Sequence, residues 1–342
     1  MDTLGEHIYP SHYWHSHSFN SQCLIQQQNR RFVVGFLITQ TRFRIIIVDR
    51  SGALEFPWVN FRGKPETFIK FAWFIAGCDL KKMGFDTSIF YKKVGDSFQR
   101  FISVVVGPPA SDEDEEIDYA NPPSDRVLTF QIEALTYRDR GVRSPGTMSW
   151  DAKEVGGDGA VVTIKDYWRH PDRQHEGELL QQAEEAGVMA VVRLIASQYE
   201  PEDLKKKIST ANARGMPTQY MKAKDGTPFI NMVHTRLVTE RQVPITEFTD
   251  KSQFLEAFAD IISGQCDAPV PLILFLSAFT AHRELLEKTN MLHRCINLNS
   301  MLLGKHGSPP GKRGLLGDLS MAVTVPRQSE DTLAERDFRA VR

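Results

Sequence analysis

The segments Met291-Leu-His-Arg-Cys-Ile-Asn-Leu-Asn-Ser-Met-Leu-Leu303 and Gly314-Leu-Leu-Gly-Asp-Leu-Ser320 decide the fold of this chain. The first carries the triplet His293-Arg-Cys295 and ends in an apolar run. In the second, a short apolar run typical of a strand ends at Asp318. Together they carry more information about fold and function than any other part of the sequence.

The composition is that of a folded globular protein with almost no net charge. Of the 342 residues 41% are apolar, which is enough for sizeable cores. The net charge is -2, from 41 basic and 43 acidic side chains. No overall field therefore draws the chain to nucleic acid or to an anionic membrane, and we expect neither as a partner. The oligomeric state does not follow from the sequence.

Cysteine usage and the N-terminus predict an intracellular protein of the cytoplasm or nucleus. The four cysteines are widely scattered and form no CxxC pair, and the first residues lack a basic region followed by an apolar one. The apolar stretch at 269–279 reaches only about half of the roughly 20 residues that a membrane-spanning helix needs. We expect it to belong to a core.

The first third of the chain predicts a small α+β region. Residues 31–38 and 43–49 are β-branched and aromatic runs separated by a polar tetrapeptide, which is typical of a β-hairpin. Residues 65–76 begin with proline and have a broad apolar face, so we expect a helix packed on a sheet. The polar, His-rich start at 1–30 is expected to be flexible.

Two polar segments interrupt the pattern further on. Residues 108–125 combine an acidic run with four prolines, which predicts a solvated linker; the alternative is a docking segment or a phosphorylation site around Ser111. Residues 198–231 are polar and irregular, and we interpret them as an insertion.

Between and after these segments the sequence alternates strands and helices. Three strands, a helix and a returning strand are expected in turn at 128–137, 147–153, 160–168, 172–186 and 188–195. Further helices are expected at 252–263, where apolar residues recur with a 3.6 period, and at 278–289.

This order of elements resembles the N-lobe of a protein kinase. Val162-Thr-Ile-Lys165 stands on the third strand as a V-A-I-K motif would, which implies that Lys165 pairs with the α/β-phosphates of ATP. Glu176 follows one helical turn ahead of two leucines and is the expected partner of that lysine, with Glu178 as the alternative. Lysines at strand ends and charged helix faces are common in proteins, so neither residue alone indicates a function. The interpretation depends on the order in which the two residues and the later motifs follow one another.

The segment at 291–303 resembles a kinase catalytic loop in which the chemistry has changed. It matches H-R-D-L-x-x-x-N at His293 and Arg294, but Cys295 replaces the aspartate that accepts the substrate proton. Ser300 replaces the asparagine that binds magnesium. Asp318, in D-L-S, stands where the metal-binding D-F-G aspartate is expected.

The glycine-rich loop that covers phosphates in kinases is the weakest match. Gly141 and Gly146 are its candidates, but their spacing is not G-x-G-x-x-G, and Pro145 removes one backbone donor.

Over residues 31–325 the chain resembles the fungal-type protein kinase domain family. The resemblance rests on Arg31-Phe-Val-Val-Gly-Phe36, Asp49-Arg-Ser-Gly52, Met83-Gly-Phe-Asp-Thr-Ser88, Ile164-Lys-Asp-Tyr-Trp168 and Leu292-His-Arg-Cys-Ile-Asn297. Asp49-Arg-Ser-Gly52 is the most distinctive, because unrelated kinases lack the N-terminal extension that contains it.

The resemblance implies an α+β, eukaryotic protein kinase-like fold with ATP and magnesium as ligands and serine or threonine phosphorylation as the ancestral activity. Few residues follow Asp318, so the helical C-lobe is expected to be incomplete. The expected organisation is a flexible N-terminus at 1–30, an α+β extension at 31–107, a linker at 108–125, an N-lobe with insertion at 126–240 and a partial C-lobe at 241–342.

The replaced residues shape the expected function. Loss of a positioned general base costs on the order of 10² to 10⁴ in rate, and a free thiol is largely protonated at neutral pH. We therefore expect a pseudokinase or weakly active remnant that binds ATP and magnesium and acts as a scaffold for a protein partner. One alternative is an active serine/threonine kinase with a protein substrate; another is an unrelated α+β protein with chance motifs.

Overall fold

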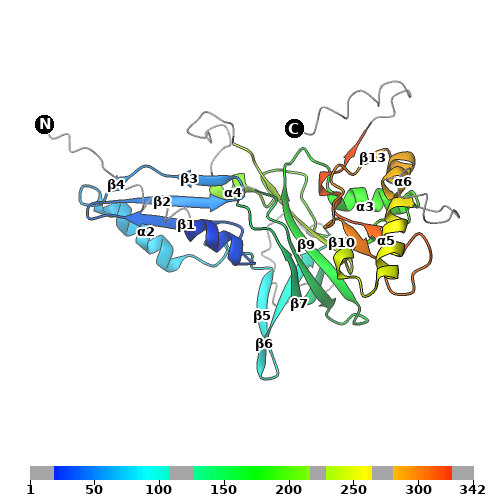
Figure 1. The fold of residues 1–342 in the computed structure, drawn as a ribbon. Helices are drawn as coiled ribbons and strands as arrows, with labels where there is room; N and C mark the ends of the chain where they lie inside the picture. The colour runs from blue at the N-terminus through cyan, green and yellow to red at the C-terminus, as the bar shows by residue number, and fades with distance from the viewer. Residues whose placement is uncertain (1–18, 108–125, 143, 216–228, 264–279, 326–342) are drawn as a thin grey trace. The chain divides into compact units, whose positions relative to one another are not determined.

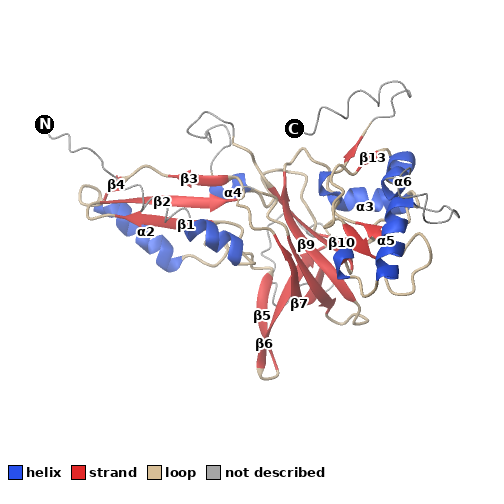
Figure 2. Cartoon of the chain, viewed as in Figure 1, coloured by secondary structure: helices blue, strands red, loops and turns tan. Residues whose placement is uncertain are grey.

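The computed structural model describes residues 19–107, 126–142, 144–215, 229–263 and 280–325 (Figure 1). The chain divides into two compact units: unit 1 consists of residues 1–172 and 196–238, and unit 2 of residues 173–195 and 239–342. It is an α+β protein, with strands predominating in unit 1 (Figure 2). The apolar stretch at 269–279 and the predicted linker at 108–125 lie outside the described residues.

Unit 1 begins with a four-stranded antiparallel sheet, which confirms the predicted hairpin. Its strands are β1 (Val33–Ile38), β2 (Arg42–Asp49), β3 (Gly52–Glu55) and β4 (Val59–Asn60). Helix α2 (Pro65–Gly77) packs aromatic side chains on this sheet, as predicted: the rings of Phe68 and Phe71 lie 5.3 and 5.5 Å from that of Phe43. Aromatic burial thus joins helix and sheet.

Residues 19–26 form a helix inside the segment that was expected to be flexible. Its Leu24 is fully buried in a small core with Val33, Ile46 and Val48. The polar composition of the N-terminus predicted flexibility, and the single leucine that anchors the helix gave no periodic signal. Residues 1–18 lie outside the described part of the chain.

A seven-stranded sheet follows in unit 1, in the order β10-β11-β9-β8-β7-β6-β5. The strands are β5 (Ile89–Val94), β6 (Ser97–Val105), β7 (Val127–Arg138), β8 (Met148–Glu154), β9 (Val161–Arg169), β10 (Leu194–Ser197) and β11 (Val233–Glu240). The predicted three-strand meander is confirmed as β7, β8 and β9, whereas β5 and β6 were not predicted. One face buries a core that includes Ile102, Phe130, Trp150 and Ile164. The short helix α4 (Thr210–Arg214) lies within the predicted insertion.

Unit 2 combines three helices with short strand pairs. The helices are α3 (Glu176–Glu185), α5 (Lys251–Ser263) and α6 (Thr280–Thr289), and the strands are β12 (Val243–Pro244), β13 (Met291–Leu292), β14 (Met301–Leu303), β15 (Gly314–Leu316) and β16 (Val323–Thr324). Helix α5 packs against α6, β14 and β15, and buries Ala257 and Ile261 with Leu303. None of the helices in the described part of the chain is both long and apolar enough to cross a membrane.

Two predicted elements around α3 differ from the structure. The helix begins at Glu176, not at residue 172, because the His175 side chain accepts a hydrogen bond from the Gly177 amide and caps it. Most of the expected strand at 188–195 is irregular: Val191 forms a single bridge with Leu316, and regular pairing begins only at Leu194. The apolar residues of this segment are buried without a ladder.

Candidate functional site

Two loops of unit 2 lie side by side because two strand pairs hold their ends. Strand β13 pairs with β16, and β14 pairs with β15. The loop at 293–300 therefore runs next to the loop at 317–322. The two segments that decided the fold in the sequence thus meet in space.

His293 links the two loops from inside. Its side chain is fully buried, and its Nε2 lies 2.8 Å from the Gly317 carbonyl oxygen. The Gly317 amide in turn donates to the Ser300 carbonyl at 2.9 Å. These contacts fix the backbone just before Asp318, so His293 acts as a structural support for the acidic loop.

Asp318 and Arg294 both adopt left-handed backbone conformations, with φ of 58° and 64°. Such angles are uncommon outside glycine and collect at functional sites, where surrounding contacts hold them. The Asp318 carboxylate is half-buried and accepts a hydrogen bond from the Ser320 hydroxyl at 2.6 Å. Arg294 is exposed.

Glu176 ties helix α3 to the acidic loop. It is the first residue of the helix and almost fully buried, and its Oε1 accepts a hydrogen bond from the Leu319 amide at 3.0 Å. Glu178, the alternative in the sequence, is exposed. The structure therefore places Glu176, and not Glu178, beside the residue that follows Asp318.

Cys295 and Ser300 are held by contacts within their own loop. The Cys295 Sγ accepts a hydrogen bond from the Asn297 side-chain amide at 3.3 Å. The buried Ser300 hydroxyl lies 3.1 Å from the Cys295 carbonyl and 2.9 Å from that of Asn297, and also accepts from the Asn297 amide. The Ser300 hydroxyl thus hydrogen-bonds to the backbone of its own loop. Its predicted role as a magnesium ligand would require the loop to rearrange.

The residues of this site fit a magnesium ion only in part. Magnesium prefers oxygen ligands and is usually held by one or two carboxylates together with substrate phosphates. Asp318 offers one half-buried carboxylate, whereas Ser300 offers no unused hydroxyl position. Asp318 is the residue that would hold the ion.

Lys165 lies in unit 1, on β9, with its side chain almost fully buried. Its Nζ stands 4.9 Å from the centre of the Tyr167 ring, close enough for a cation–π interaction. Glu176 belongs to unit 2, so the expected pairing of these two residues stays a prediction.

The predicted phosphate loop, also in unit 1, holds an arginine. The Arg50 Nη1 donates to the Gly141 carbonyl at 2.7 Å. A Cβ at Gly146 would come within 2.4 Å of the Arg50 guanidinium, and the φ of Gly146 is 57°. Gly146 is therefore explained by close approach to Arg50, whereas a Cβ at Gly141 would meet Ser144 at 2.8 Å; the role of both glycines toward phosphate stays a prediction.

The comparison with protein families identifies the family of the chain. The model of the fungal protein kinase family matches residues 17–267 and 270–340. The chain belongs to the fungal protein kinase family. The match extends over both units and includes the altered loop at 293–300. No curated protein shows significant similarity to this family member.

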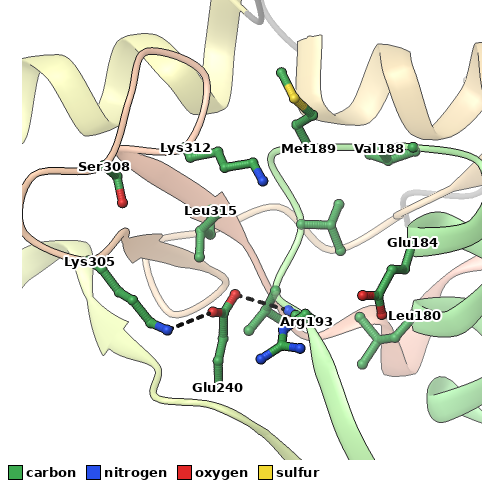
Figure 3. Close-up of a pocket in the computed structure, with 13 residues that line it drawn as sticks. Leu180, Glu184, Val188, Met189, Arg193, Glu240, Lys305, Ser308, Lys312 and Leu315 are labelled. Atoms are coloured by element: carbon green, nitrogen blue, oxygen red, sulfur yellow. Dashed lines mark hydrogen bonds and ion pairs between the residues drawn. The ribbon is translucent and has the colours of Figure 1, made fainter.

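A separate hollow of about 320 Å³ lies within unit 2 (Figure 3). Leu180, Val188, Val191, Val192 and Leu315 give it apolar walls. At its edge Lys305 pairs with Glu240 at 3.7 Å. No predicted site residue lines it, so it is distinct from the loops around Asp318.

Sequence reasoning missed a buried charge cluster in unit 1. Arg236 on β11 donates to Asp166, Asp86 and Ser88, and all four side chains are buried. No role was assigned to these residues from the sequence. An arginine inside an apolar strand, together with an aspartate next to the strand lysine, was the available signal.

Proposed function

We propose that this member of the fungal protein kinase family has a kinase-like fold, binds ATP with magnesium, and transfers phosphate slowly or not at all. One observation carries the proposal: the Asp318 loop is braced by Glu176 and His293 as a metal-binding loop needs, while a thiol stands where the general base is expected. In this proposal the loop that would bind the metal is thus retained, whereas the general base for phosphate transfer is replaced.

In this proposal two side chains hold the nucleotide. Lys165 contacts its phosphates, and Asp318 holds the magnesium ion. A magnesium ion held there would supply positive charge that neutralises the phosphates. The left-handed backbone at Asp318 sets the direction of its carboxylate, and the hydrogen bond from Ser320 restrains one of its oxygens.

The chemical deficit lies in the loop at 293–300. A general base must accept the proton of the attacking hydroxyl, and its loss costs on the order of 10² to 10⁴ in rate. The Cys295 Sγ already accepts a hydrogen bond from the Asn297 side-chain amide. A scaffold role toward a protein partner is consistent with such a site.

Thermal unfolding with and without ATP and magnesium tests ligand binding. At about 100 times the dissociation constant, a ligand stabilises the folded protein by roughly 2.7 kcal/mol, which raises the midpoint by several degrees. We expect Lys165→Met and Asp318→Asn to lose this rise. Lys153→Met is the matched control, because Lys153 is an exposed lysine on the neighbouring strand β8. An equal rise in all four proteins, or none in any, would refute the proposed site.

Phosphate transfer to a general protein substrate tests the chemistry. We expect negligible transfer by the unmodified chain and a gain of about 10²-fold or more in the double variant Cys295→Asp, Ser300→Asn. Substantial transfer by the unmodified chain, lost in Asp318→Asn, would instead establish an active serine/threonine kinase.

A further inference from the structure

A small, partly open cavity in unit 1 joins the segments that are most distinctive in the sequence. It measures about 20 Å³, room for one water molecule or one monatomic ion. Arg31, Arg50, Asp86 and Asp166, each from a different one of these segments, line it together with His234. The cavity lies within unit 1; neither Lys165 nor Asp318 lines it, whereas Gly146 of the predicted phosphate loop does.

A metal ion is the first ligand to consider, because Asp86, Asp166 and His234 offer ligand atoms within 4.8 Å of one another. However, both carboxylates already bind the Arg236 guanidinium, at 2.9 Å from Asp86 and 2.6 Å from Asp166. Arg31 adds a further ion pair to Asp86 at 2.8 Å. A metal cation would have to displace two guanidinium groups, so the geometry does not favour one.

Buried nitrogen atoms beside the cavity lack hydrogen-bond partners. They are the Nε atoms of Arg31 and Arg50 and the Nδ1 of His234. Arg50 is only 3% exposed and His234 only 8%. A buried donor that gives up water without gaining a partner is costly, so the two arginine Nε–H groups call for a ligand that accepts hydrogen bonds, whereas His234 Nδ1 is itself an acceptor while Nε2 donates to Asp166.

The charged groups around the cavity indicate whether that ligand is positively or negatively charged. Four guanidinium groups stand against three carboxylates; the residues are Arg30, Arg31, Arg50 and Arg236, and Asp86, Asp139 and Asp166. One positive charge remains in excess. Arg30 and Arg31 are only partly buried, but the positive excess still attracts an anion, which would neutralise it, whereas a water molecule would not.

We propose that this cavity binds one small inorganic anion of the size of chloride, which accepts hydrogen bonds from the Nε groups of Arg31 and Arg50. The anion would link the Asp49–Gly52 segment to the seven-stranded sheet within unit 1. The small volume of the cavity favours a monatomic ion over the larger phosphate or sulfate.

Thermal unfolding of the full chain in matched salts tests the proposal. We expect the midpoint to rise in a saturable way with sodium chloride or bromide, but not with sodium gluconate at the same ionic strength, because gluconate is too large to enter. Crystals grown with bromide should show an anomalous peak at the cavity. Identical unfolding in the three salts, without such a peak, would mean that water fills the cavity and would overturn the proposal.

A matched pair of variants locates the effect. Arg31→Lys keeps a positive charge near Asp86 but removes the unpaired Nε group, and should abolish the halide-dependent rise. Arg44→Lys is the control: Arg44 also pairs with a carboxylate, Glu55, at 2.7 Å, and also has an unpaired buried Nε, but it does not line the cavity. Loss of the rise in both variants, or in neither, would overturn the assignment. Stabilisation by sulfate that competes with chloride would refute the size argument.

Discussion

Unit 1 and unit 2 each contain a charged cluster, and the two clusters differ in how far their charged groups are buried and hydrogen-bonded. In unit 1, Arg236 makes hydrogen bonds to Asp86, Asp166, Ser88 and the Ser103 carbonyl, and is buried with them. In unit 2, Asp318 stays half-buried on a left-handed backbone, next to a loop with a second left-handed residue. Buried charges that are hydrogen-bonded to one another serve the fold, whereas the half-buried Asp318 is the residue that we propose holds magnesium.

Titration behaviour follows from the first arrangement. Burial alone would raise the pKa of the Asp86 carboxyl, but the Arg31 and Arg236 guanidiniums outweigh it and hold that pKa below its ordinary value. The pKa of Asp166 is likewise lowered, because Arg236 and His234 outweigh its burial. Both carboxylates therefore stabilise the fold in their charged form.

The largest expected effect comes from breaking the unit 1 cluster. Arg236→Met leaves two buried carboxylates with too few partners, and breaking a buried ion pair in this way costs about 3 to 5 kcal/mol. Urea unfolding of the purified variant should show this loss. Lys153→Met, which removes an exposed pair with Glu133, should cost less than about 1 kcal/mol. Similar losses of unfolding free energy in the two variants would show that the buried cluster of unit 1 stabilises the fold no more than an exposed ion pair does.

Acid unfolding sharpens the same comparison. Because the folded-state pKa values of Asp86 and Asp166 lie below the unfolded ones, their stabilisation is present above the unfolded value, about 4, and is lost as the pH falls toward the folded values. Without Arg236 part of the attraction that lowers both pKa values is lost, so acidification should cost Arg236→Met less stability than it costs the parent chain. Unfolding free energies measured from neutral pH down to pH about 3 check this. If the unfolding free energies of the two proteins fell by the same amount over this pH range, the prediction would be wrong.

An intermediate effect is expected where helix α3 meets the acidic loop. Glu176→Ala leaves the buried Leu319 amide without its acceptor, which should cost about 1 to 3 kcal/mol and reduce the stabilisation by ATP and magnesium. Glu178→Ala, two residues on and exposed, should change stability by less than about 0.5 kcal/mol. Equal effects of the two substitutions in urea unfolding would mean that Glu176 does not support the loop.

The sequence predicted the elements of the fold better than their charged contacts. The hairpin of β1 and β2, the meander of β7 to β9, and helices α2 and α5 follow from local periodicity and turn residues, which act over a few residues. Strands β5 and β6 were missed because charged residues hid their alternation, as in Lys92 and Lys93. The start of α3 was misplaced because a histidine cap is an unusual signal.

The candidate site was predictable only where a motif carries it. His293 and Asp318 were found by resemblance, and the structure shows why the histidine is needed: it holds the Gly317 carbonyl. The role of Ser300 within its own loop depends on side-chain direction, which the motif does not specify. Arg50 and Arg236 were missed because their partners lie far away along the chain, for example Gly141 and Asp86. Such long-range pairs leave no local pattern.

The smallest expected effect tests whether the unit 2 loops are strained at all. Arg294 is exposed with φ of 64°, so Arg294→Gly should relieve backbone strain and raise the unfolding free energy by up to about 1 kcal/mol, net of the entropy that glycine adds to the unfolded chain. At an exposed, ordinary helical position such as Arg283 in α6, the same change should lower it by about 1 kcal/mol. The opposite signs are the test, measured by urea unfolding of both variants. If Arg294→Gly destabilises as much as Arg283→Gly, the left-handed conformation costs nothing, and the contrast between a relaxed cluster in unit 1 and a strained site in unit 2 fails.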